Sequence, residues 1–85
     1  MDARARSAAE EAIRSLGRGD VPSARTAIAE AYDLDHTLGG LADVVYLACS
    51  EIDGRDGVTT ATWNTLADAV AHDALLAVVE EVRDA

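Results

Sequence analysis

Apolar residues recur every three or four positions along most of this chain, which is the spacing of one face of an α-helix. Residues 2–17 place charged side chains such as Glu10, Glu11 and Arg14 outside this stripe. A second stripe predicts a helix from Val21 to Asp33. The apolar positions of the first stripe are Ala5, Ala8, Ala9, Ala12, Ile13 and Leu16.

The stretch between these two helices is typical of a tight turn. Gly17 and Gly19 end the first helix, and Asp20 stands where the N-cap of the second belongs. Pro22 is tolerated in the first turn of a helix, where its missing N–H is not needed. Small residues on the inner face of the second helix, such as Ala24, let two backbones approach closely. We therefore expect a helical hairpin over this third of the chain.

Two more helices are predicted beyond the hairpin. Thr37 is placed to cap a third helix, which carries apolar residues from Leu38 to Ile52 and has Gly39-Gly40 in its first turn. Residues 53–57 form an Asp/Gly-rich loop, after which Thr59 or Thr60 caps the last helix.

The last stripe reaches the C-terminus without interruption. We therefore expect one helix of about 25 residues over 59–84, rather than two helices that break near His72-Asp73. The predicted fold is all-α, a single domain over residues 1–85, with four helices arranged as two antiparallel hairpins.

The hydrophobic fraction of 49% consists largely of alanine: the chain has eighteen alanines and no phenylalanine. Alanine favours helices but buries little area per residue, so the core is expected to be thin. Trp63, Tyr32 and Tyr46 are its largest candidate members. Any of these aromatic residues that is exposed instead becomes the best candidate anchor of an interface.

The net charge of −9 is unevenly distributed. Residues 1–25 hold five arginines against four acids, whereas residues 26–85 hold two arginines against twelve acids. A surface this acidic repels phosphate backbones and anionic lipids, so we expect neither a nucleic-acid nor a membrane partner. A basic partner protein, or simple solubility, fits this charge.

The sequence shows no apolar signal region and no run of ~18 apolar residues. A single cysteine, Cys49, excludes an internal disulfide. These features predict a cytoplasmic protein. All seven basic residues are arginine, a composition associated with GC-rich bacterial genomes.

The hairpin from about Ala5 to Asp35 resembles a tetratricopeptide repeat. Its small residue within the first helix, its glycine–aspartate turn and its alternating small and bulky residues in the second helix fall at that family's offsets. The family's aromatic positions in the first helix are not met, and His36 replaces its exit proline. The matching residues are Ala12, Gly19, Asp20, Ala24, Ile28 and Ala31. The resemblance implies a scaffold that binds peptides or proteins through a groove.

Candidate chemical sites are sparse in this sequence. Gly57 at the sixth position of a calcium loop would put Trp63 at the twelfth, where a ligating glutamate is required. Asp33, Asp35 and His36, joined by His72, are candidate metal ligands, but they equally suit a solvated helix end. Cys49 lies on an apolar face that does not activate a thiol. We therefore expect no catalytic activity, no metal and no cofactor.

The sequence thus predicts a protein–protein interaction module whose partner is another protein or a peptide. Arginines of the first helix are either a solvated face with local glutamate pairs or an anchor for an acidic peptide. We expect an exposed groove between the first and third helices. The alternative is a homodimeric bundle that buries the apolar tail over residues 74–79. The candidate partner-binding residues are Arg6, Arg14, Arg18, Trp63 and Leu76.

Overall fold

The structure is a computed structural model that describes residues 2–55, 57–71 and 75–84, and these residues form only helices and their connections. The five α-helices of the described residues are α1 (Ala3–Gly17), α2 (Val21–Leu34), α3 (Gly39–Gly54), α4 (Thr60–Ala69) and α5 (Leu76–Asp84). A 3-10 helix, η1 (His36–Leu38), joins α2 to α3. The prediction of an all-α fold is confirmed. The first three helices lie where they are expected, except that α3 continues to Gly54 and so includes the first two residues of the loop predicted over 53–57.

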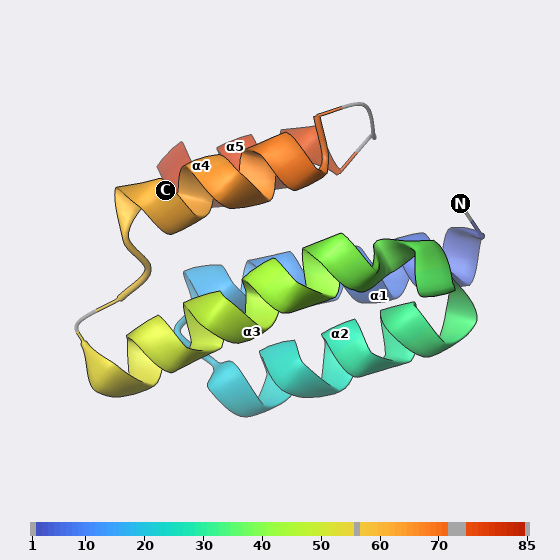
Figure 1. Ribbon diagram of the computed structural model, residues 1–85, viewed down its shortest axis with the longest axis horizontal. Coiled ribbons are helices and arrows are strands. Elements are labelled where there is room, and N and C mark those ends of the chain that lie inside the picture. Colours follow the sequence, from blue (N-terminus) through green and yellow to red (C-terminus); the bar gives the residue numbers. More distant parts are fainter. Residues whose placement is uncertain (1, 56, 72–74, 85) are drawn as a thin grey trace.

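The turn between α1 and α2 follows from its own residues. Gly19 has a φ of 72°, a left-handed conformation that glycine adopts without strain. The carboxylate of Asp20 then caps α2 by accepting a hydrogen bond of 3.2 Å from the backbone N–H of Ser23. The chain reverses direction here, so α1 and α2 run antiparallel (Figure 1).

The α1–α2 interface is lined mainly by alanine. The alanines of this interface are completely or almost completely buried, which allows the two helix backbones to lie close together. Ile13 and Ile28 supply the largest buried side chains of the pair. The buried alanines are Ala5, Ala8, Ala9, Ala12, Ala24, Ala27 and Ala31.

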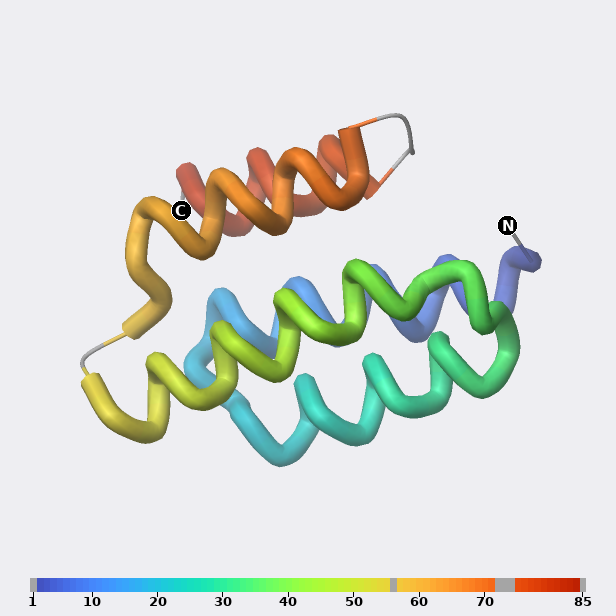
Figure 2. Tube along the Cα trace, viewed as in Figure 1, coloured from blue at the N-terminus to red at the C-terminus, as the bar shows by residue number. Residues whose placement is uncertain are grey.

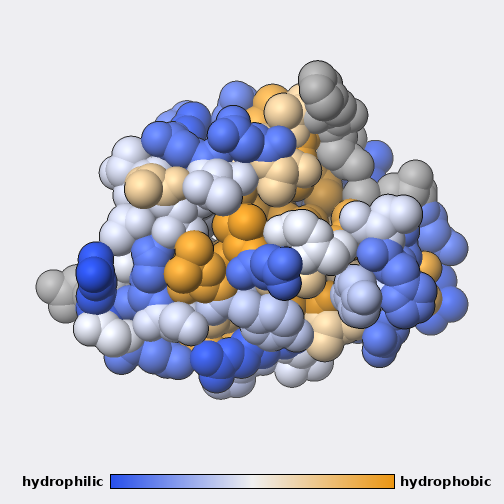
Figure 3. Space-filling model, in the orientation of Figure 1, coloured by the Kyte–Doolittle hydropathy of each residue, from blue (hydrophilic) through white to orange (hydrophobic). Residues whose placement is uncertain are grey.

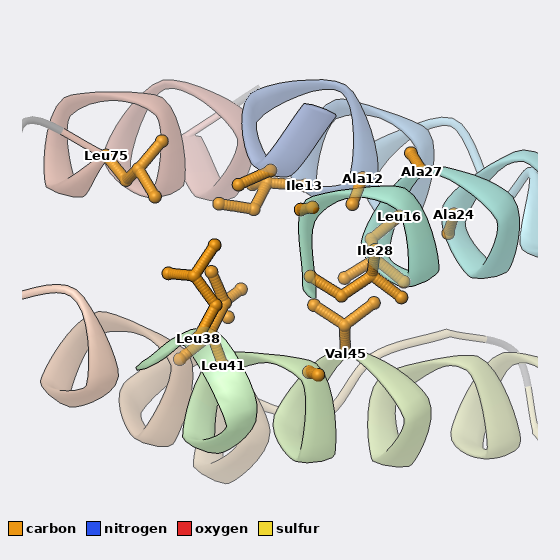
Figure 4. Close-up of a cluster of buried hydrophobic side chains, with 14 of the residues drawn as sticks. Ala12, Ile13, Leu16, Ala24, Ala27, Ile28, Leu38, Leu41, Val45 and Leu75 are labelled. Atoms are coloured by element: carbon orange, nitrogen blue, oxygen red, sulfur yellow. The ribbon is translucent and has the colours of Figure 1, made fainter. Parts of the chain in front are cut away.

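The remaining helices enclose this pair. Helix α3 packs on α2 and also touches α1, and Figure 4 shows Ile28 and Val45 pointing toward each other across the α2–α3 interface. Helix α4 packs on α3, and α5 packs on α1 and α4. The α4–α5 hairpin therefore lies over α1 and α3 (Figure 1).

The prediction of one long last helix is wrong, and with it the count of four helices. Helix α4 ends at Ala69, and α5 begins at Leu76 and runs back alongside it (Figure 2). A straight helix of about 25 residues would span about 37 Å, whereas the longest dimension of the molecule is 33 Å. Folding back buries both Val70 and Leu75 instead of leaving one of them in solvent. The position of the alternative break, His72-Asp73, lies outside the described residues.

One of the predicted helix caps is wrong and another is confirmed. Thr37 does not cap α3, because its N–H and hydroxyl both donate to the carboxylate of Asp35, which starts η1. Helix α3 begins at Gly39 without a side-chain cap. Thr59 caps α4 as predicted, accepting a hydrogen bond of 3.3 Å from the N–H of Thr62.

A carboxylate joins the end of α3 to the start of α4. The hydroxyls of Thr59 and Thr62 both donate to Glu51, at 3.0 Å and 2.8 Å for the oxygen Oε2. The hydrogen bond from Thr62 is the main reason that the pKa of Glu51 lies below its ordinary value. Because these bonds favour the ionised carboxylate, they hold the two helices together more strongly while Glu51 is charged.

We predict that Glu51 makes folding sensitive to acid. Its folded-state pKa is lowered, so its contribution is complete above the ordinary glutamate pKa and is lost as the pH falls through the lowered value. Glu51→Gln should destabilise the protein by about 1 kcal/mol near neutral pH. Urea unfolding across this pH range should show the gap between wild type and variant closing in acid. A gap that stays constant with pH would contradict this account.

We further predict that Gly17 is required by the approach of α5. A Cβ atom at Gly17 would overlap the side chain of Val82. Gly17→Ala should therefore destabilise the fold by about 1–3 kcal/mol, although alanine is the better helix former. Gly40→Ala is the matched control, because a Cβ there meets no other atom and should stabilise α3.

The Gly17→Ala/Val82→Ala double variant completes the test. Shortening Val82 removes the overlap, so urea unfolding should show that Gly17→Ala is no longer destabilising in this background. If Gly17→Ala stabilises the protein as Gly40→Ala does, the close contact is absent in solution.

Candidate functional site

Two tyrosines expected in the core lie at the surface instead. Tyr32 on α2 is 39% exposed and Tyr46 on α3 is 42% exposed. Each follows directly after a fully buried residue, Ala31 and Val45 respectively, and so stands at the edge of its helix's buried stripe. Both rings lie outside the buried stripes of their helices, so the prediction that these tyrosines fill the core is wrong.

Both tyrosines line one surface hollow between the end of α2 and the first half of α3. The hollow encloses about 400 Å³, and we call it the tyrosine hollow. Leu47, which is 51% exposed, follows Tyr46 on α3 and continues the apolar surface. Figure 3 shows hydrophobic side chains reaching the surface along α3 and between α3 and the α4–α5 hairpin. The lining residues of the tyrosine hollow are Tyr32, Gly39, Ala42, Asp43 and Tyr46.

The ring of Tyr32 lies close to His36 and to the backbone of Gly39. His36 on η1 lies edge-on to it, with ring centroids 4.9 Å apart and an interplanar angle of 88°. On α3, a Cβ built on Gly39 would lie 3.6 Å from Cε2 of Tyr32. The tyrosine ring therefore lies beside a glycine that contributes no side chain to the hollow.

The electrostatic environment of the tyrosine hollow is acidic. Residues 32–46, which include every lining residue of the hollow, contain three acids, one histidine and no arginine or lysine. Asp43 lines the hollow itself, and no ion pair to it occurs within the described residues. Arg25, the one arginine of α2, pairs with Asp53 at 3.2 Å. The hollow thus presents two aromatic rings and a carboxylate.

The three arginines predicted to bind a partner lie along α1. Arg6 pairs with Glu10 at 3.0 Å, and Arg14 lies 3.7 Å from Glu81 of α5. Arg18 pairs with Glu11 at 2.8 Å, a contact that lowers the pKa of Glu11. All three pairs are at the surface, where such contacts contribute little to stability. Because twelve residues separate Arg6 from Arg18, these two positions lie about 18 Å apart along the helix.

Trp63 and Leu76, the other predicted partner-binding residues, are both partly buried. Trp63 lines a second hollow of about 410 Å³ together with Arg18, so the structure brings these two candidates together. Leu76 packs against the core from α5. That these five residues contact a partner stays a prediction.

The two surfaces expected to be open are largely covered by the chain itself. The expected groove between the first and third helices is covered by the α4–α5 hairpin, which packs on α1 and α3. Of the described part of the apolar tail, Leu75, Val78 and Val79 are buried, and Ala77 is exposed. Ala74 lies outside the described residues.

The candidate chemical residues do not assemble into a centre in the part of the chain that is described. Cys49 is completely buried, and its burial raises the pKa of the thiol. Asp35 is occupied by Thr37, whose hydrogen bonds lower its pKa. Over residues 2–55, 57–71 and 75–84, no three His, Cys, Asp or Glu side chains are placed to hold a metal. His72 lies outside these ranges.

None of the helices seen in the described residues combines the length and the apolar character needed to cross a membrane. Comparison of this chain with protein-family models, with curated proteins and with solved structures finds no match.

Sequence reasoning missed the tyrosine hollow because it placed both rings in the core. The sequence feature that indicates the tyrosine hollow is the clustering of Tyr32, Gly39, Asp43 and Tyr46 near the α2–α3 connection. Their meeting depends on how α3 packs against α2, which periodicity alone does not define.

We predict that Cys49 reacts slowly while the protein is folded. A buried thiol with a raised pKa holds little thiolate, and the reagent cannot reach it. Alkylation by iodoacetamide, followed by mass spectrometry, should be at least about tenfold slower in buffer than in guanidinium chloride. Equal rates in the two solvents would show that Cys49 is accessible.

Proposed function

We propose that this protein is a non-catalytic, cytoplasmic protein–protein interaction module that binds a partner protein through the tyrosine hollow. The observation that carries the proposal is the exposure of Tyr32 and Tyr46 side by side on a concave surface. Buried interface anchors are most often aromatic residues and arginine, placed in pockets that exclude water. The acidic surroundings of the hollow favour a basic partner.

The support beneath Tyr32 makes the tyrosine hollow suited to binding. The ring of His36 contacts the ring of Tyr32, which reduces the side-chain freedom that is lost when a partner docks. An anchor that is held in place before binding avoids an ordering cost of about 0.5–1.5 kcal/mol for each side chain.

The resemblance of the α1–α2 hairpin to a tetratricopeptide repeat supports a scaffold role. In this structure Ala12, Ala24, Ile28 and Ala31, four of the residues that carry the resemblance, are all completely buried. We propose that the hairpin is the rigid base on which α3 and the tyrosine hollow are mounted.

We favour partner binding over the homodimeric bundle. The apolar tail that suggested self-association is mostly covered by α1 and α4, which leaves a small surface for pairing. Pairing two copies through their tyrosine hollows would bring acidic surfaces together, and Asp43 would face carboxylates of the other copy. We therefore keep the homodimer as the alternative that the experiment below detects.

Selection from a random peptide display library tests the proposed function. Peptides should be enriched on the wild-type protein and counter-selected on the Tyr32→Ala/Tyr46→Ala double variant. We expect enriched peptides to bind the wild type and to lose at least about tenfold in affinity on the double variant, because truncating interface aromatics typically costs more than 1 kcal/mol.

The control is a Tyr→Phe pair at the same positions, which keeps both rings and should keep most of the affinity. Light scattering run in parallel reports the mass in solution. A library that yields no tyrosine-dependent binder, or a stable mass near twice 8.9 kDa, would contradict the proposal, and the second result would favour the homodimer.

A further inference from the structure

We infer that the tyrosine hollow is a receptor for the side chain of an arginine in the partner protein. This inference rests on the proposed function and names the chemistry that its surface recognises. It is drawn from three properties of the hollow: its charge, its aromatic lining and its size.

Asp43 on the tyrosine hollow forms no ion pair with any other described residue. The lining residues all fall within residues 32–46, which hold three acids, one histidine and no arginine or lysine. The arginines with ion pairs in the described residues, Arg6, Arg14, Arg18 and Arg25, are each engaged by another carboxylate of the chain. Asp43 is thus left to solvent or to a partner. Charge complementarity therefore points to a basic side chain as the occupant.

The aromatic lining favours arginine over lysine. A guanidinium group is planar and weakly hydrated, so it stacks on tyrosine rings and still donates hydrogen bonds from its edge. Asp43 lies on the same hollow as both rings and offers the carboxylate that this edge pairs with. A lysine ammonium is more strongly hydrated and does not stack as a plane.

The volume of the hollow and the absence of a side chain at Gly39 leave space for a long side chain of the partner. It encloses about 400 Å³, and Gly39 leaves the space next to Tyr32 open. An apolar side chain of the partner would remove water from Asp43 without replacing its hydrogen bonds, which is unfavourable. An acidic side chain would be repelled by the same carboxylate.

Titration of the ¹⁵N-labelled protein with capped glycine–serine peptides tests the inference. Three peptides are compared at low salt. Each carries a central pair of identical residues, which are arginines, lysines or glutamates. The arginine peptide should shift the amide signals of Gly39, Asp43 and Tyr46 and bind at least about threefold more tightly than the lysine peptide. The glutamate peptide should not bind.

Variants of the lining residues should weaken binding of the arginine peptide by amounts that reflect their contacts. Tyr46→Ala should weaken it by about tenfold, since it removes a stacking ring. Asp43→Asn should weaken it by about threefold and reduce its dependence on salt.

A matched pair of glycine variants tests whether the arginine side chain enters the hollow or is only attracted to an acidic surface. A methyl group at Gly39 would contact the Tyr32 ring at 3.6 Å and occupy part of the hollow, whereas a methyl group at Gly40 meets no other atom. Both positions lie at the start of α3, where alanine favours the helix. Gly39→Ala should weaken binding by about threefold, and Gly40→Ala should bind as the wild type does.

The outcomes distinguish this inference from the proposed function. Equal binding of the arginine and lysine peptides, or equal effects of Gly39→Ala and Gly40→Ala, would overturn the arginine receptor. Tyrosine-dependent peptides from the display library that lack arginine would also overturn it, while the proposed function would stand. If neither the library nor the arginine peptide gives tyrosine-dependent binding, both proposals fail.

Discussion

The close contact between α1 and α2 is the constraint on which the rest of the molecule depends. Alanine lines this interface from both sides, so the two backbones lie near each other and each residue buries little area. Large aliphatic side chains supply most of the buried volume, and Ile13, Ile28, Val45 and Leu75 are completely buried. Tyr32 and Tyr46 stand at the edges of the buried stripes of α2 and α3 and stay exposed.

A core this thin also explains the last third of the chain. The α1–α2 pair and α3 leave an apolar side that must be covered, and α4 and α5 cover it by folding back on each other. Leu66 and Val79 are completely buried in doing so, and Gly17 lets α5 approach the end of α1. The same covering closes the groove expected between the first and third helices.

Features set by neighbouring residues were predictable from the sequence, and features set by distant contacts were not. The turn at Gly19 and the caps at Asp20 and Thr59 follow from local chemistry, and the structure has them as expected. The break between α4 and α5 was missed because apolar residues continue through it at helical spacing. The tyrosine hollow was missed because it exists only once α3 has packed on α2.

Tyr32 and Tyr46 therefore lie outside the buried core, and we expect them to contribute less to stability than the core side chains do. The most direct measurement is the free energy of unfolding, by urea, of the Tyr32→Ala/Tyr46→Ala variant beside Ile28→Ala as a core reference. The account predicts a loss below about 1 kcal/mol for the double variant, as at surface positions, against about 2–5 kcal/mol for Ile28→Ala. A loss for the tyrosine variant as large as that of Ile28→Ala would make both rings structural and would contradict the account.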